Sequence, residues 1–152
     1  IKIFKISQEK MVNVIDKIKI FEPLILKNKK GDVLRMLRKT DKWFTNISEI
    51  YFSEIKPRQI KAWKKQKFKS QIISVPVGLI KLVIYDDKKN LFTEVILGRN
   101  SHKLIKIPPK LWYGFKSLSN KKSLIVNCTN KVHKDADTYS LDFKLNKIPF
   151  KW

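Results

Sequence analysis

Short apolar runs recur along the chain from Ile18 onward and are separated by polar or turn-forming clusters about every ten residues. This spacing is typical of an all-β sandwich or barrel, and it predicts about ten strands. Pro57 and Gly78 mark two of the strand ends, because proline donates no ladder hydrogen bond and glycine accepts a positive φ. The predicted strands cover residues 18–26, 49–55, 71–77, 79–85, 92–97, 102–107, 123–129 and 139–143.

The predicted strand 79–85 is apolar on both faces. Side chains alternate along a strand, so Ile80, Leu82 and Ile84 share one side. The opposite side is also apolar except at Lys81. A strand of this kind is expected to be covered on both sides.

The N-terminal segment has a different pattern. Residues 7–17 combine a Ser7 N-cap with clustered apolar residues, which predicts a short helix. Because the chain begins with Ile1 and not with methionine, we expect the natural start to be missing. No internal repeat or low-complexity linker interrupts the chain, so we expect a single domain spanning residues 1–152.

Positive charge changes the range of expected partners. The chain has 34 Lys and Arg against 13 Asp and Glu, a formal net charge of +21, which is compatible with nucleic-acid binding. However, the excess is almost entirely lysine and runs from Lys2 to Lys151 without forming one block. Base reading and bidentate phosphate contacts favour arginine. An anionic sugar nucleotide fits the charge equally well, and so does codon bias in an AT-rich genome.

Cysteine content and hydropathy bear on the cellular compartment. Cys128 is the single cysteine, so the chain forms no internal disulfide and has no CxxC metal motif. We therefore expect a reducing cytoplasm. No apolar run has the length of a membrane span, and the N-terminal residues 1–10 do not match a secretory signal.

Five phrases in order resemble one known family. They are "IKIFEPLILKNKKGDVLRML", "QIKAWKKQ", "VPVGLIKLVIYDDKKN", "IPPKLWYGF" and "LIVNCTN". In sequence and spacing they resemble the dTDP-4-dehydrorhamnose 3,5-epimerases of the cupin superfamily, over residues 18–152. The resemblance implies a cupin-type jelly-roll sandwich, usually a homodimer in which strands cross between subunits, with a nucleotide-sugar pocket inside the barrel and no cofactor.

The phrase "IPPKLWYGF" resembles family text on the pocket wall. By this resemblance Trp112, Tyr113 and Phe115 line the pocket or pack just behind it. Plain core packing is an equally good account of Trp112 and Phe115, because such rings bury large apolar areas. Tyr113 is the better pocket candidate, because its hydroxyl needs a polar partner and it takes the place of a family histidine.

The usual catalytic residues of the family are absent. Epimerisation beside a ketone needs a base to remove a carbon-bound proton and an acid on the other face to return one. Family members use a histidine in text like "LRGLHYQ" and a tyrosine after "CTDY". Here Lys64 stands at the histidine position, and Lys131 and Val132 follow "NCTN". A lysine acts as a base only if burial or neighbouring positive charge lowers its pKa.

Other positions suit substrate binding. The resemblance puts Lys61 at a family arginine, and it puts Lys30 and Arg35 in a strip that holds the nucleotide. An anionic diphosphate would be attracted to such a cluster. The predicted substrate-binding residues are Lys30, Arg35, Lys61, Gln66, Gln71, Trp112 and Lys131.

The predicted catalytic residues are Lys64, Tyr113 and Asp86. Asp86 follows a strand and could orient a pocket lysine, although turn capping explains at least one of Asp86 and Asp87. His102 and His133 lie in separate segments without ligand spacing, so we expect no metal.

Two hypotheses follow from the sequence. The first is an epimerase-like cupin of nucleotide-sugar metabolism that binds a nucleotide-linked 4-keto sugar and either catalyses an altered isomerisation or has lost turnover. The second is a non-catalytic cupin module that uses its basic surface for nucleic acid or an acidic partner.

Overall fold

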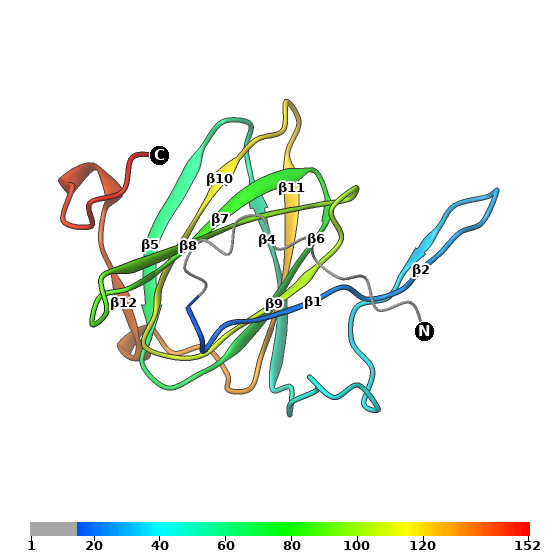
Figure 1. Ribbon diagram of the computed structural model, residues 1–152, viewed down its shortest axis with the longest axis horizontal. Helices are drawn as coiled ribbons and strands as arrows, with labels where there is room; N and C mark the ends of the chain where they lie inside the picture. The colour runs from blue at the N-terminus through cyan, green and yellow to red at the C-terminus, as the bar shows by residue number, and fades with distance from the viewer. Residues whose placement is uncertain (1–14) are drawn as a thin grey trace.

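Two five-stranded antiparallel sheets face each other in the computed structural model, which describes residues 15–152 (Figure 1). The first sheet has the order β1 (Lys19–Phe21), β9 (Leu104–Ile107), β6 (Gln71–Val77), β11 (Ser123–Thr129) and β4 (Glu49–Ile55). The second has the order β12 (Thr138–Ser140), β5 (Ile60–Gln66), β10 (Trp112–Ser117), β7 (Leu79–Asp86) and β8 (Leu91–Gly98). This architecture confirms the predicted all-β cupin-type jelly roll.

Sequence patterns located most of the strands. The runs 49–55, 71–77 and 123–129 coincide with β4, β6 and β11. The run 18–26 divides into β1 and β2 (Ile25–Leu26), and β12 is shorter than the run predicted there. Both β5 and β10 lay outside the predicted runs. The alternation of β5 is obscured by lysines, and β10 follows two prolines and contains a glycine.

A hydrophobic core occupies part of the space between the sheets. Its members are nearly inaccessible to solvent and come from both sheets, and burial of such side chains is the main stabilising contribution in a sandwich. Aliphatic residues predominate, among them Ile55, Ile73, Ile80, Leu82, Ile84, Leu97, Ile105 and Ile125.

Strand β7 is covered on both faces, as its sequence predicted. Ile80, Leu82 and Ile84 face the inner core. Val83 and Tyr85 belong to a second cluster on the outer face of the second sheet. The C-terminal segment supplies the cover for that cluster, through Leu141, Phe143, Ile148, Phe150 and Trp152.

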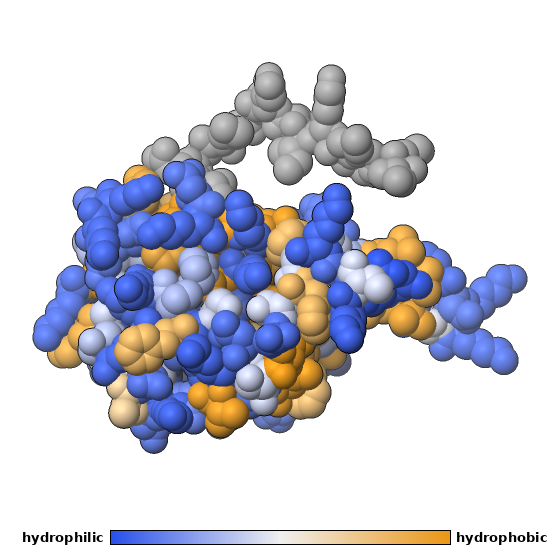
Figure 2. Space-filling view, turned by 90° about the horizontal axis from the view of Figure 1, so that it is seen from below, coloured by the Kyte–Doolittle hydropathy of each residue, from blue (hydrophilic) through white to orange (hydrophobic). Residues whose placement is uncertain are grey.

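A hairpin of β2 and β3 (Val33–Leu34) projects from the sandwich (Figures 1 and 2). Leu24, Leu26 and Val33 are exposed on or beside it. Arg99 from the turn after β8 donates to Asp32 Oδ2 over 2.8 Å and so connects the hairpin to the body of the fold. Its exposed leucine and valine side chains give the hairpin an apolar surface that faces solvent.

Two shorter features complete the chain. The 3-10 turns η1 (Asp135–Asp137) and η2 (Phe143–Leu145) flank β12 in sequence. The helix predicted over residues 7–17 lies mostly outside the described residues. Only residues 15–17 of it are described, and Asp16 and Lys17 form a turn. Within residues 15–152, no helix has the length and apolar character needed to cross a bilayer.

Candidate functional site

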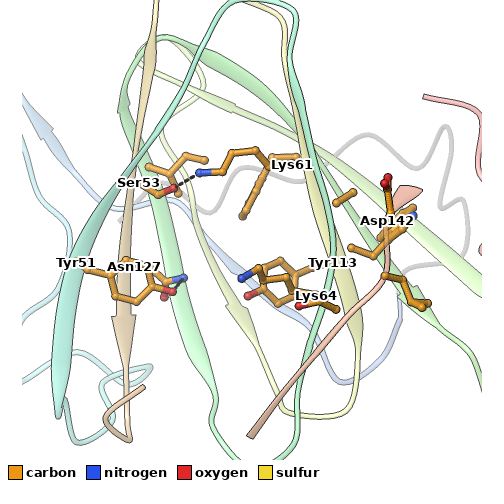
Figure 3. Close-up of a pocket in the computed structure, with 13 residues that line it drawn as sticks. Tyr51, Ser53, Lys61, Lys64, Tyr113, Asn127 and Asp142 are labelled. Atoms are coloured by element: carbon orange, nitrogen blue, oxygen red, sulfur yellow. Dashed lines mark hydrogen bonds between the residues drawn. The ribbon is translucent and has the colours of Figure 1, made fainter. Parts of the chain in front are cut away.

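A cavity of about 430 Å³ opens between the two sheets beside the inner core (Figure 3). Its walls come from β4, β5, β10, β11, the end of β12 and the segment after it. Polar and charged side chains share the lining with rings and aliphatic groups. The lining residues are Tyr51, Ser53, Lys61, Ala62, Trp63, Lys64, Tyr113, Phe115, Ile125, Asn127, Ser140, Leu141 and Asp142.

A bulge between β5 and β10 presents both cavity lysines. Lys64 pairs with Tyr113 and Lys61 pairs with Phe115, so two residues of β5 lie opposite one residue, Gly114. In a regular strand, residues 61 and 64 would face opposite sides of the sheet. The extra residue of a bulge restores them to the same side. Accordingly Lys61 and Lys64 both line the cavity.

The two residues of β5 that lie opposite Gly114 face outward. The side chains of Ala62 and Trp63 join the outer aromatic cluster, although both residues also border the cavity. Their peptide bond is cis. The centroid of the Trp63 ring lies 5.0 Å from that of Trp152 and 6.0 Å from that of Phe150. Trp63 also exchanges two backbone hydrogen bonds with Leu141. The C-terminal segment thus packs directly behind the bulge.

Gly114 is required at the centre of the bulge for steric reasons. A Cβ at this position would lie 2.4 Å from the Ala62 Cβ and 3.0 Å from Trp152 Cζ2. Real Cβ atoms do not approach other carbons so closely. The glycine of "WYGF" therefore permits the close approach of β5, β10 and the C-terminal segment.

Lys61 is held against strand β4. Its Nζ donates to Ser53 Oγ over 2.8 Å (Figure 3). It also donates to the Glu54 carbonyl over 3.2 Å. Burial lowers the pKa of Lys61, and the neighbouring charge of Lys64 lowers it further. Both lysine side chains also remain exposed to solvent. Lys61 is therefore a positioned amine with a reduced affinity for its proton.

Tyr113 projects into the cavity from β10 and is 5% exposed. Its hydroxyl accepts a 3.1 Å hydrogen bond from Gln66 Nε2. The Gln66 Oε1 atom accepts a hydrogen bond from the Thr138 hydroxyl. Burial raises the pKa of Tyr113, so the phenol keeps its proton well above neutral pH. Gln66 is buried behind Tyr113 and positions it.

A second phenol, Tyr51, comes from β4 in the other sheet. Asn127 Nδ2 donates to the Tyr51 hydroxyl over 2.9 Å and to Gln71 Oε1 over 2.8 Å. Burial raises the pKa of Tyr51, and the nearby Tyr113 adds to this effect. Neither Tyr51 nor Asn127 was predicted from the sequence. Alternation in "EIYFSEI" and "SLIVNCT" could have placed both on inward faces.

Asp142 brings a carboxylate to the cavity from the segment after β12 (Figure 3). Its Oδ1 accepts from Lys144 N at the start of η2. In β12 just before it, Ser140 pairs with Lys64 of β5. Pairing along the edge of β5 therefore fixes the position of the carboxylate.

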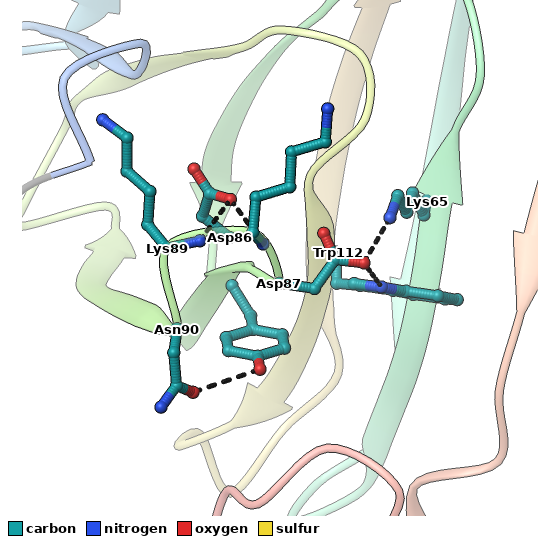
Figure 4. A network of polar contacts seen from close by, with 8 residues as sticks. Lys65, Asp86, Asp87, Lys89, Asn90 and Trp112 are labelled. Carbon is teal, nitrogen blue, oxygen red and sulfur yellow. Dashed lines mark hydrogen bonds and ion pairs between the residues drawn. The ribbon is translucent and has the colours of Figure 1, made fainter.

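Several predicted site residues lie outside the cavity lining. Asp86 is buried at the end of β7, where its Oδ1 accepts from the backbone N–H groups of Lys88 and Lys89 (Figure 4). This is the turn-capping arrangement that the sequence analysis left open. Trp112 donates from Nε1 to Asp87 Oδ2 over 3.1 Å and lies under the Lys65 ammonium. Both contacts lie on the outer side of the second sheet.

Three predicted binding residues, Lys30, Arg35 and Lys131, are also absent from the lining. Lys30 lies in the turn of the β2–β3 hairpin, and Arg35 follows β3, where its carbonyl contacts His102 Nε2. Lys131 is exposed after β11. Among residues 15–152, no group of three His, Cys, Asp or Glu side chains could hold a metal ion.

Comparisons with known proteins agree with the fold and with the order of the sequence phrases. A dTDP sugar isomerase from Desulfovibrio desulfuricans G20 is 35% identical, with 90% of this chain and 91% of that chain aligned and a TM-score of 0.86. The chain belongs to the dTDP-sugar epimerase and isomerase family. This finding confirms the family predicted from the sequence.

Two proteins of lower sequence identity are also similar to this chain over most of its length. The probable low-salt glycan biosynthesis epimerase Agl13 of Haloferax volcanii is 24% identical over an alignment of 135 residues. The alignment covers 82% of this chain and 86% of that protein. A dTDP-4-dehydrorhamnose 3,5-epimerase from Sulfolobus tokodaii shares the fold with 20% identity and a TM-score of 0.77, over 91% of this chain and 85% of the other. No family model matches the sequence. Within this epimerase and isomerase family, an epimerase-like role in nucleotide-sugar metabolism is favoured over a nucleic-acid-binding module.

We predict that Gly114→Ala destabilises the fold by about 1–3 kcal/mol, because the new Cβ overpacks the bulge. Replacing Ala62 by glycine in the same chain removes the clashing atom and should recover part of that loss. Urea unfolding of the two single variants and the double variant measures this coupling. Strictly additive effects would contradict the close contact between the two residues.

The raised pKa of Tyr113 predicts a loss of stability at alkaline pH. The unfolded chain ionises this phenol near pH 10, whereas the folded protein still holds the proton. The native state then binds more protons, so its stability falls as pH rises above about 10, by up to about 1.4 kcal/mol per pH unit. Unfolding of Tyr113→Phe between pH 7 and 11 should show a shallower decline. An identical decline in both proteins would contradict the burial effect.

Proposed function

We propose that the cavity binds the sugar of a nucleotide-linked 4-keto sugar and moves a proton at a carbon beside the keto group. The observation that carries this proposal is the convergence of Lys61, Lys64, Tyr51 and Tyr113 on one cavity. Its volume of about 430 Å³ lies in the range of small-molecule sites. The 35% sequence identity with a dTDP sugar isomerase also supports a nucleotide-sugar ligand.

The side chains have complementary roles in this proposal. Lys64 removes the proton from carbon, as its place in the family pattern suggests. Lys61 faces the keto oxygen, where a cation stabilises the developing enolate. Tyr113 lies on the wall next to Lys64, and Tyr51 belongs to the facing sheet. Because burial keeps both phenols protonated, either can return a proton to the sugar.

Gln66 and Gln71 are assigned to positioning. Gln66 fixes the Tyr113 hydroxyl, and Gln71 fixes Asn127, which contacts Tyr51. Both amides are buried and contact side chains of the lining, although neither glutamine is itself a lining residue. The sequence predicted that both glutamines contact the substrate directly. In this proposal they act on the substrate only through the side chains that they position.

We also propose a cytoplasmic homodimer in which residues 1–152 act as one cupin domain. The exposed apolar side chains of the β2–β3 hairpin, with Ile50 and Phe52 on edge strand β4, offer surface for a second subunit. In such a dimer Lys30 and Arg35 on the hairpin could reach a nucleotide in the neighbouring cavity. The free, buried Cys128 is consistent with a reducing compartment.

We predict that the protein catalyses exchange of solvent deuterium into TDP-4-keto-6-deoxyglucose. Lys64→Ala should slow exchange by about 10²–10⁴-fold, the usual contribution of a positioned base. Lys116→Ala is the matched control, because Lys116 is on β10 but does not line the cavity. Mass spectrometry of the recovered sugar measures the exchange. A wild-type rate equal to that in buffer would eliminate the catalytic proposal.

Ligand binding is measured separately by thermal unfolding with TDP, UDP, GDP and CMP sugars. A ligand that binds only the native state raises the midpoint by mass action. The alternative function, a nucleic-acid-binding module, instead requires measurable affinity for random DNA that falls steeply with salt.

A further inference from the structure

The cavity contains two primary amines, and the proposed substrate contains a ketone. A primary amine condenses with a ketone to form an iminium, which withdraws electrons from the neighbouring carbons more strongly than the ketone does. We propose that Lys61 forms a Schiff base with the keto carbon of the bound sugar and that Lys64 moves the proton on the adjacent carbon. This inference rests on the proposed function and specifies how the keto group is activated.

The contacts of Lys61 suit a nucleophilic amine. Its Nζ has two acceptors, Ser53 Oγ and the Glu54 carbonyl. A neutral amine carries two N–H groups and one lone pair, so these acceptors engage both N–H groups and leave the lone pair free. An arginine, the residue that family members have at this position, could not form a Schiff base, because its guanidinium remains protonated.

The surroundings of Lys61 favour the neutral amine. Burial and the charge of Lys64 both lower its pKa, and Phe115 and Ile125 add apolar surface to the same cavity. A lysine beside a second cation in a partly apolar pocket is a recognised arrangement for Schiff-base chemistry. A bound sugar ring would displace water from the cavity and so lower the pKa of Lys61 further.

The proton balance can be written with the two lysines alone. The neutral Lys61 amine attacks the keto carbon, and the Lys64 ammonium gives a proton to the departing oxygen. One water leaves, and the products are a Lys61 iminium and a neutral Lys64 amine. Lys64 then removes the proton from the neighbouring carbon, which gives a neutral enamine and restores its ammonium.

The reverse steps return the product. Tyr51, on the facing wall, gives its proton to the opposite face of the enamine carbon, and the iminium forms again. Lys64 returns a proton to the Tyr51 phenolate through water. One water then adds to the iminium carbon, Lys64 recovers the proton set free, and the ketone leaves with Lys61 as a neutral amine. No oxidant, reductant or metal enters the balance.

Trapping the iminium tests the proposal. The protein is incubated with TDP-4-keto-6-deoxyglucose and sodium cyanoborohydride, which reduces an iminium to a stable secondary amine. We expect a covalent adduct of one sugar nucleotide per chain, located on Lys61 by peptide mass spectrometry. Lys61→Arg should lose the adduct and slow deuterium exchange by at least about 100-fold. Lys116→Arg should retain both.

The outcomes separate this inference from the proposed function. Exchange and binding without an adduct would overturn the Schiff base and leave the proposed function intact. An adduct on Lys64, or one spread over surface lysines and unaffected by excess TDP, would overturn the assignment to Lys61. Absence of both binding and exchange would overturn both proposals. Binding of TDP to Lys61→Arg, measured by thermal unfolding, shows that the variant is folded.

Discussion

The candidate site depends on one local irregularity, the bulge that places Ala62 and Trp63 of β5 opposite Gly114 of β10. Because side chains alternate along a strand, a regular β5 would direct Lys61 and Lys64 to opposite faces. The bulge directs both into the cavity and directs the Ala62 and Trp63 side chains to the outer cluster. Close packing at Gly114 and the aromatic cover from the C-terminal segment hold the bulge in place.

This arrangement links the stability of the outer face to the chemistry of the inner face. Trp63 exchanges backbone hydrogen bonds with Leu141, and the next residue, Asp142, lines the cavity. The C-terminal segment therefore supports the lysines from behind and also contributes a carboxylate in front. Three buried amides, Gln66, Asn127 and Gln71, hold the hydroxyls of Tyr113 and Tyr51 in place. The cavity is a product of several elements that are distant in sequence.

The sequence predicted the architecture better than the site. Apolar runs bounded by turn-forming residues located β4, β6, β7 and β11, and each of these strands has at least one buried face. The same criterion missed β5, in which lysines interrupt the apolar pattern. Lys61, Lys64 and Tyr113 were selected through the resemblance and line the cavity, whereas Asp86 caps a turn. Alternation could have placed Tyr51 and Asn127 on inward faces, but only the pairing of β4 with β11 shows that they lie side by side.

The most direct test of this account is acetylation of lysines with and without TDP-glucose, which has no keto group and so cannot form a Schiff base. Mass spectrometry reports the labelling rate at each position. A bulged β5 predicts that the ligand protects Lys61 and Lys64, while Lys65 on the outer face reacts at an unchanged rate. A regular strand would instead put Lys61 and Lys65 on the same face. Protection of Lys65 in place of Lys64 would contradict the account.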